Sequence, residues 1–313
     1  MSDNHVIDGA VPLVTAENYG LHEADIRAGG LTALAPTVAS LESYEVAMAA
    51  VRRWHQVAGR VKICVDPGDL DAARRAGRTG IVLHFQGGDP LEASLEHLRE
   101  FAEAGVRVIQ PTYNATNALG AGSLTDEPFG LTAFGRTAVA TMGELGVIPD
   151  VSHASERTAL DTLDAATGTV IASHSNAKAR YDHPRNIGDE VIRGIAARGG
   201  VVGVCGFPGF LGPDTHSPTT DDLIDHAVHI ADLVGEQHVS LGLDFADEDD
   251  EDYAYFGYDP KYYPPPPWTY PPGIAAFTDF PSFAARALAR GLSEQFVTGL
   301  MGNNYARVLS EVA

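Results

Sequence analysis

Short β-branched apolar runs alternate with amphipathic segments along the whole of this 313-residue chain. This alternation is typical of repeated strand–helix units that build a parallel sheet. Eight candidate strands are present, at residues 5–12, 31–38, 81–86, 106–112, 147–151, 169–173, 200–205 and 238–244. Because eight parallel strands close a barrel, the sequence predicts an α/β fold: a single (β/α)8 (TIM) barrel domain over residues 1–313.

Residues 245–273 break the alternation. The segment carries six acids between Asp247 and Asp252, nine aromatic residues and a run of four prolines at 264–267. Such a stretch cannot be helical throughout, and it is too long for an ordinary connection between a strand and a helix. Because it follows the eighth strand, we expect it to form a lid over the C-terminal ends of the strands. A disordered acidic surface loop is the alternative.

The composition limits the partners and the compartment. A net charge of -21 argues against nucleic acid, because binding to phosphates needs clustered Lys and Arg. Cys64 and Cys205 lie in separate apolar runs, where they are expected to be small buried side chains and not a disulfide or metal pair. The chain shows no targeting segment at its start and no 18-residue apolar run. We therefore expect a cytoplasmic protein with a small-molecule substrate and no membrane association, and leave open whether it forms a homodimer.

Two histidines follow consecutive predicted strands, in Asp150-Val151-Ser152-His153 and in Ser173-His174-Ser175-Asn176. The C-terminal ends of neighbouring parallel strands meet on one face of a barrel, so the two imidazoles should converge as metal ligands do. In a metal-free pocket the same side chains could instead act as acid, base or hydrogen-bond donor. The pattern alone does not choose between these roles.

Other predicted strands end in polar residues that should face the same centre. The third strand delivers His84 and Gln86, the fourth Tyr113 and Asn114, and the eighth Asp244. Asp244 is interpreted as a general base, with a purely structural role beside a histidine as the alternative. Tyr113 and Asn114 could hold a substrate oxygen or stabilise an oxyanion, although packing would also explain them.

The ordered series of strand-end residues resembles the membrane (renal) dipeptidase family of metallopeptidases (peptidase family M19), within the amidohydrolase superfamily. The similarity extends over nearly the whole chain. Its most specific blocks are residues 130–135, 150–153, 173–176, 183–186, 199–204, 242–245 and 302–307. The resemblance implies a metal-dependent hydrolase barrel with dipeptidase activity.

In this family a dinuclear zinc centre uses a His-x-Asp pair from the first strand, a bridging Glu from the third, and one His each from the fifth and sixth. An aspartate after the eighth strand handles protons, while an arginine and a further histidine hold the substrate. By resemblance, His153 and His174 match the two later metal ligands, Asp244 matches the aspartate and Arg185 matches the arginine. A salt bridge within the loop is the alternative role for Arg185.

The remaining family positions have changed. Ala10 and Pro12 stand where the His-x-Asp ligands should be, Gln86 replaces the bridging glutamate, and Tyr113 replaces the substrate histidine. Because Ala and Pro side chains cannot ligate a metal, and a neutral amide cannot bridge two dications, the sequence predicts that no dinuclear centre forms.

A single zinc ion remains compatible with the residues that are left. Its ligands would be His153 and His174 with an oxygen from Gln86 or Asp244, leaving one position for water. His84 is a further candidate ligand, although its deeper place in the strand also fits a packed barrel histidine. Asp8, at the start of the barrel, is a weaker candidate for the same pocket.

Three hypotheses follow. The first is a dipeptidase-like hydrolase that acts on a small amide- or peptide-like substrate bearing a carboxylate, with Asp244 moving the proton and Arg185 anchoring the carboxylate, and with at most one zinc. The second is a non-hydrolytic enzyme of specialised metabolism, with isomerase, lyase or condensation chemistry in a metal-free pocket. The third is a catalytically dead binding protein.

Overall fold

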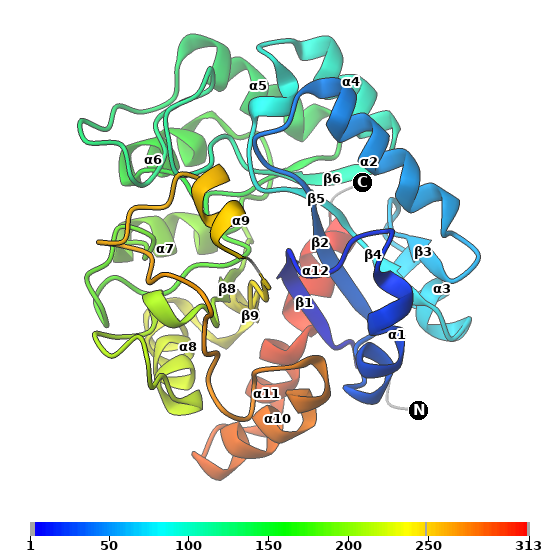
Figure 1. Cartoon of the computed structure of the whole chain (residues 1–313), viewed down its shortest axis with the longest axis vertical. Coiled ribbons are helices and arrows are strands. Elements are labelled where there is room, and N and C mark those ends of the chain that lie inside the picture. Colours follow the sequence, from blue (N-terminus) through cyan, green and yellow to red (C-terminus); the bar gives the residue numbers. More distant parts are fainter. Residues whose placement is uncertain (1–3, 248, 312–313) are drawn as a thin grey trace.

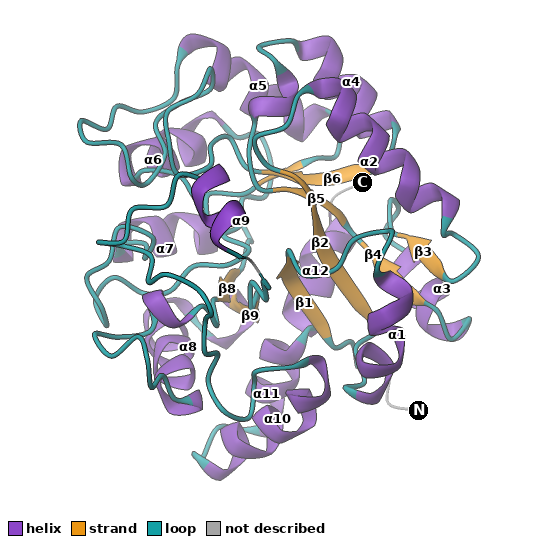
Figure 2. Cartoon of the chain, in the orientation of Figure 1, coloured by secondary structure: helices purple, strands orange, loops and turns teal. Residues whose placement is uncertain are grey.

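The structure is a computed structural model that describes residues 4–247 and 249–311. Parallel strands stand in a ring at the centre and helices surround them (Figures 1 and 2). The ring strands are β1 (Ile7–Val11), β2 (Ala33–Ala39), β5 (Leu83–Phe85), β6 (Val106–Ile109), β7 (Ile148–Pro149), β8 (Val202–Val204) and β9 (Val239–Leu241). The helices are α1 (Tyr19–Ala28), α2 (Tyr44–Gln56), α3 (Asp69–Arg75), α4 (Leu95–Glu103), α5 (Ala133–Glu144), α6 (Glu156–Ala165), α7 (Asp189–Ala197), α8 (Thr220–Val234), α9 (Asp250–Tyr255), α10 (Phe280–Ala289), α11 (Glu294–Met301) and α12 (Asn303–Glu311).

The strand pairings close the ring. β1 pairs with β2, and β2, β5, β6 and β7 follow as parallel neighbours. The predicted sixth strand is present only as single bridges, from Asp150 to Ile171 and from Ala172 to Val202, which join β7 to β8. β8 pairs with β9, and the Asp244 N–H donates to the Ala10 carbonyl at 2.9 Å to join the last strand to the first. The predicted (β/α)8 barrel is therefore confirmed.

One strand lies outside the eight that the sequence analysis identified. β3 (Val61–Ile63) pairs with β4 (Thr79–Ile81), and β4 pairs with the first half of β2, while the second half of β2 pairs with β5. β4 and β5 together correspond to the predicted third strand, interrupted at Val82. The apolar run around Cys64 thus builds a sheet extension, and Cys64 is buried as expected.

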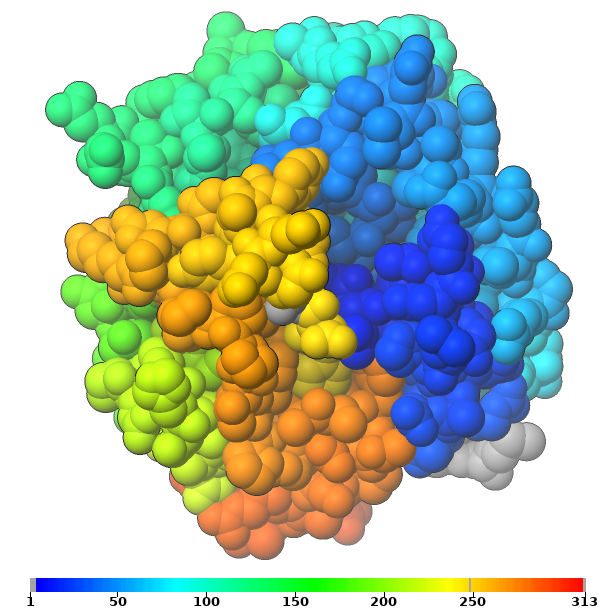
Figure 3. All heavy atoms as spheres, in the orientation of Figure 1, coloured from blue at the N-terminus to red at the C-terminus, as the bar shows by residue number. Residues whose placement is uncertain are grey.

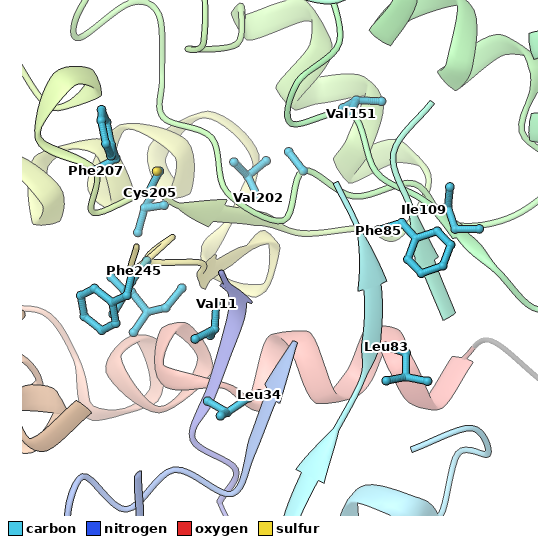
Figure 4. Packing of buried hydrophobic residues seen from close by; sticks show 14 of the residues in the cluster. Val11, Leu34, Leu83, Phe85, Ile109, Val151, Val202, Cys205, Phe207 and Phe245 are labelled. Carbon is cyan, nitrogen blue, oxygen red and sulfur yellow. The ribbon is translucent and has the colours of Figure 1, made fainter. Parts of the chain in front are cut away.

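Side chains alternate between two apolar layers. Leu34, Phe85, Ile109, Val151 and Val202 belong to the large core that lies between the strands and the surrounding helices (Figure 4). A second, smaller cluster fills the lower barrel; it includes Ile7, Val82, Val108, Ile148, Ile171 and Tyr305. Tyr305 comes from α12, which passes behind β1 and β2 and covers that end of the barrel (Figure 1). The polar residues next along each strand are consequently buried above an apolar floor.

The described residues of the segment 245–273, which are all but residue 248, lie over the opposite end of the barrel and contain a single short helix, α9 (Figures 1 and 3). We call this segment the lid. The Tyr270 hydroxyl donates to the Asp244 carbonyl at 2.5 Å, and the Trp268 ring packs edge-on against Phe207 with 4.7 Å between centroids. No helix in the described part of the chain is both long and apolar enough to cross a membrane.

Two glycines allow the strands beside His174 to pack closely. A Cβ atom built on Gly203 would lie 1.9 Å from the Ser173 carbonyl oxygen, and one on Gly242 would lie 1.8 Å from the same oxygen. Neither contact can be relieved by a side-chain rotation, because the obstacle is backbone. The position of Ser173, and hence of His174, depends on these two residues lacking a side chain.

We expect Gly203→Ala to destabilise the protein by about 3 kcal/mol, because the added methyl group must push the Ser173 strand segment aside. Urea unfolding measures the change. Gly212→Ala is the matched control, since a Cβ there meets nothing within 4 Å. Equal stability of the two variants would show that the barrel accommodates the methyl group and would contradict this account.

Candidate active site

The buried carboxylate of Asp150 accepts hydrogen bonds from several polar groups in the layer under the histidines. One carboxylate oxygen accepts hydrogen bonds from the backbone N–H groups of Ser152 and Ser173 and from the Ser152 hydroxyl. The other accepts from the Ser173 hydroxyl at 2.5 Å and from Gln110, and it lies 3.1 Å from His84 Nε2. Burial by itself would raise the pKa of Asp150, but the hydrogen bond and charge of His84 hold that pKa well below its ordinary value.

This carboxylate determines which nitrogen of His174 carries a proton. The single hydroxyl hydrogen of Ser173 is committed to Asp150, so the Ser173 oxygen must accept from His174 Nδ1–H, 2.7 Å away. Burial lowers the pKa of His174 to about 4. At neutral pH the imidazole is therefore uncharged, and its Nε2 carries a lone pair.

That lone pair faces the second histidine. His153 Nε2 lies 2.9 Å from His174 Nε2, and His153 Nδ1 lies 2.9 Å from the Asn114 side-chain oxygen. Burial lowers the pKa of His153 well below its usual value. With the Asn114 oxygen toward His153, the proton of His153 is on Nδ1, which donates to that oxygen. Neither Nε2 atom then carries a proton, and the two facing lone pairs need a shared cation. With the Asn114 amide reversed, His153 Nε2–H donates directly to His174 and no cation is required.

The residues do not fit a dinuclear metal centre. Ala10 and Pro12 lie at the first-strand positions and supply no ligand atom, and the Gln86 amide nitrogen donates to Asp244 at 3.1 Å. Among the described residues, no three His, Cys, Asp or Glu side chains gather as a metal site. What remains is the pair of imidazoles, with Gln86 and Asp244 lining the same cavity as His153.

Two further candidates lie away from the imidazole pair. His84 is fully buried, its Nε2 faces Asp150, and its ring centroid is 6.3 Å from that of His174, so it belongs to the layer below. Asp8 is also fully buried, and one of its oxygens accepts from the backbone N–H groups of Leu243 and Ala10. Burial raises the pKa of Asp8 to about 7.

Asp244 has an unusual backbone. Its φ is +57°, in the left-handed region that residues other than glycine rarely adopt. The surrounding structure holds this conformation through the Asp244 N–H to Ala10 and the Tyr270 hydroxyl to the Asp244 carbonyl. Strained backbone of this kind is concentrated at functional sites, and here it places the carboxylate against Gln86 on the cavity wall.

Arg185 lies behind the site and is only 1% exposed. Its Nη1 donates to the Ser152 carbonyl, its Nε donates to the Tyr263 hydroxyl at 3.1 Å, and its guanidinium carbon lies 5.1 Å from the centre of the Phe210 ring. Arg185 thus makes no side-chain ion pair in the described structure. It lies close to the site, but Tyr263 stands in front of it.

The space between these groups is a cavity of about 40 Å³. Its polar lining is Gln86, His153, Asp244, Thr37, Ser40 and the hydroxyl-bearing rings of Tyr113, Tyr258 and Tyr263, and its apolar lining includes Phe207, Phe256 and Trp268. Tyr113 stacks on the His153 ring at 4.1 Å, and its hydroxyl lies 2.7 Å from that of Tyr258. The sequence analysis identified the lid but did not single out its cavity-lining rings; their signal was the density of aromatics after the eighth strand.

A groove of about 600 Å³ adjoins this cavity and shares Pro12, Thr37, Ser40 and Phe256 with it. It runs between the lid and the loops that follow β1 and β2, where Figure 3 shows a hollow between yellow and blue atoms. The groove therefore borders the cavity that Asp244 and His153 line.

The sequence of this chain is similar to those of known proteins over most of its length. The sequence profile of membrane dipeptidase (peptidase family M19) matches residues 25–254. An uncharacterized dipeptidase of Schizosaccharomyces pombe is 34% identical over 251 residues, which cover 78% of this chain and 56% of the relative. The dipeptidase tcpJ of Claviceps purpurea is 28% identical over 255 residues, which cover 81% and 56%. The chain thus spans little more than half the length of these curated relatives.

Solved structures share the same fold. An amidohydrolase from Pseudomonas aeruginosa superposes with a TM-score of 0.90 at 30% identity, over 99% of this chain and 97% of the other. A metallo peptidase from Rhodobacter sphaeroides, crystallised with a phosphinate mimic of the dipeptide L-Ala-D-Ala, superposes with a TM-score of 0.83 at 21% identity, over 99% and 100%. The second likeness concerns the fold alone.

Asp8 makes the stability depend on pH in a defined direction. Its folded-state pKa of about 7 exceeds the ordinary value of 3.8. Between these two pH values the folded protein therefore keeps a proton on Asp8 that the unfolded chain has already released. This carboxyl therefore lowers stability as pH rises from about 4 to about 7, by about 4 kcal/mol at 1.4 kcal/mol per tenfold change in proton affinity.

We expect Asp8→Asn to remove this decline, because the amide oxygen keeps the two backbone hydrogen bonds but does not ionise. The measurement is urea unfolding of both proteins at several pH values between 4 and 8. The difference between them should grow with pH in favour of the variant. A constant difference would mean that Asp8 is ionised throughout, and the assigned pKa direction would be wrong.

Proposed function

The chain belongs to the membrane dipeptidase family, and from this membership we propose that it hydrolyses a small amide- or peptide-like substrate that bears a carboxylate. The observation that carries the proposal is the convergence of the Asp244 carboxylate and the His153 imidazole on one cavity, with the Arg185 guanidinium directly behind the cavity wall. These are a proton acceptor, a neutral imidazole and an anion-binding group within one site.

Asp244 is proposed as the general base. Gln86 orients the carboxylate by donating to one of its oxygens at 3.1 Å, which leaves the other oxygen to take a proton from the attacking water. The same carboxyl group can return that proton to the leaving amine. Positioned proton transfer of this kind contributes about 10²- to 10⁴-fold to a rate.

Substrate positioning is assigned to Arg185, Tyr113 and Asn114. The planar guanidinium can hold a carboxylate through two parallel hydrogen bonds. The Tyr113 hydroxyl lies on the cavity wall, where it can donate to a substrate oxygen that becomes negative as water attacks. Asn114 contacts both His153 and Tyr263, so it orients the imidazole beside the reacting group.

The family is one of metallopeptidases, and the finer proposal is that this chain binds at most one zinc ion. Its ligands would be His153 and His174 with an oxygen from Gln86 or Asp244. When bound, the ion would supply Lewis-acid polarisation of the substrate carbonyl. The protein residues keep their proposed roles in binding, orientation and proton transfer.

Metal content and turnover test this reading together. We expect no more than one zinc per chain by elemental analysis after dialysis against zinc, and loss of that zinc in His174→Ala. A panel of dipeptides assayed with and without added zinc should contain at least one that is cleaved. The absence of bound metal and of turnover under both conditions would refute the hydrolase proposal.

Asp244→Asn tests the proton-transfer role. We expect kcat to fall about 10²- to 10⁴-fold with little change in Tm, because the amide keeps the size of the carboxylate but cannot accept the proton. Asp247→Asn, an exposed acid on the neighbouring groove, is the control and should keep its activity. A variant Asp244→Asn with undiminished kcat would remove Asp244 from the mechanism.

A second candidate function is favoured by one observation. The reversed Asn114 amide satisfies both histidines without any ion, and among the described residues no third His, Cys, Asp or Glu side chain groups with them as a metal site. This arrangement suits non-hydrolytic isomerase, lyase or condensation chemistry on a specialised metabolite. Activity that is indifferent to chelator, with a ligand retained on the purified protein in native mass spectrometry, would support it over hydrolysis.

A further inference from the structure

On the edge of the Arg185 guanidinium next to Tyr263, only one of the two nitrogens has a hydrogen-bond partner among the described residues. Nε and Nη2 form one edge of the group, the edge on which a carboxylate can accept two parallel hydrogen bonds. Nε donates to the Tyr263 hydroxyl at 3.1 Å, whereas Nη2 is buried without a hydrogen-bond partner among the described residues. The Tyr263 hydroxyl oxygen has two lone pairs, and it accepts from Arg185 Nε and from the Asn114 amide nitrogen, so none is left for Nη2 and this buried charged donor is unsatisfied.

Tyr263 reaches this position from the lid. Its hydroxyl also accepts from the Asn114 amide nitrogen at 2.9 Å, so a single oxygen stands between the two groups assigned to the substrate. The ring stacks on Tyr258 at 4.3 Å and packs edge-on against Phe210 at 5.3 Å. Tyr263 lines the cavity and Arg185 does not, which means that the tyrosine covers the arginine.

The cavity is too small for a substrate as it stands. Its volume of about 40 Å³ has room for only a few water molecules, since one water needs roughly 10–15 Å³ of such space. A dipeptide has about ten non-hydrogen atoms and needs several times that space. Lid side chains must therefore move before a ligand can reach Arg185, and Tyr263 is the side chain bonded to it.

We propose that Tyr263 is a specificity-determining residue whose hydroxyl occupies the place of the substrate carboxylate on Arg185 and Asn114. A ligand binds by displacing this hydroxyl. The inference rests on the proposed function in that Arg185 is taken as the carboxylate anchor, and it adds that the anchor is reached only by exchange with the lid.

The exchange selects for anions with two oxygens. A neutral group such as an amide would replace one acceptor by another and gain little. A carboxylate satisfies Nε and Nη2 together and adds charge-assisted hydrogen bonds, which are about twice as strong as neutral ones. The need to displace Tyr263 thereby favours the binding of carboxylate ligands over that of their neutral analogues.

Calorimetric titration with glycyl-L-alanine and with glycyl-L-alaninamide tests the proposal. The wild-type protein should bind the acid and show much weaker binding of the amide. Tyr263→Phe keeps the ring packing but removes the competing hydroxyl, so it should bind the acid about fivefold more tightly, as expected for loss of one net hydrogen bond. Tyr262→Phe is the control, since that hydroxyl contacts Lys261 at the surface and should leave both affinities unchanged.

The possible results are distinct. Weaker binding of the acid to Tyr263→Phe would overturn the proposal, because the hydroxyl would then be a donor to the ligand; unchanged binding would overturn it as well. Either result with dipeptide turnover intact leaves the proposed function standing. If no variant binds the acid and none is active, the proposed function and this inference both fail.

Lid movement gives a second measurement that does not depend on the substitution of Tyr263. In a Trp54→Phe background the remaining tryptophan is Trp268, whose ring lies in the lid 4.7 Å from Phe207. Its fluorescence should change on addition of glycyl-L-alanine and stay constant with the amide. Binding of the acid with no change in this emission would contradict displacement of the lid.

Discussion

The ionised carboxylate of Asp150 is the interaction on which the rest of the site depends. It is fully buried in the barrel and joins the ends of two neighbouring strands through Ser152 and Ser173. Its hydrogen bond with the Ser173 hydroxyl fixes the tautomer of His174, and that tautomer determines what His153 can do. A buried carboxylate is tolerated here because six hydrogen-bond partners replace its hydration.

The two ends of the barrel are closed in different ways, and the difference positions the chemistry. At one end the second apolar cluster and α12 exclude water from the strands. At the other, the lid covers the polar strand ends with aromatic rings and hydroxyls, so that Asp244 and His153 face a cavity that is nearly shut. The site is therefore preorganised around a small volume, and access depends on side chains that contact Arg185.

Much of this could be predicted from the sequence. The barrel and the convergence of His153 with His174 follow from strand-end positions. The mismatch of Ala10 and Pro12 with a dinuclear centre follows from the resemblance to the dipeptidase family, together with the chemistry of Ala and Pro side chains. The sixth strand was predicted over 169–173, but it pairs only through single bridges at Ile171 and Ala172. β3 was missed, because a short apolar run around Cys64 does not reveal its pairing partner.

The sequence by itself determined which groups reach the C-terminal end of the barrel, because a parallel strand delivers its last residues to one face whatever lies around it. Only the tertiary structure decided what those groups contact. His84 faces Asp150 instead of His174, Gln86 donates to Asp244, and Arg185 lies under Tyr263. These contacts join residues that are 66 to 158 positions apart in the sequence. Contacts at such separations are set by tertiary packing, which no local sequence pattern encodes.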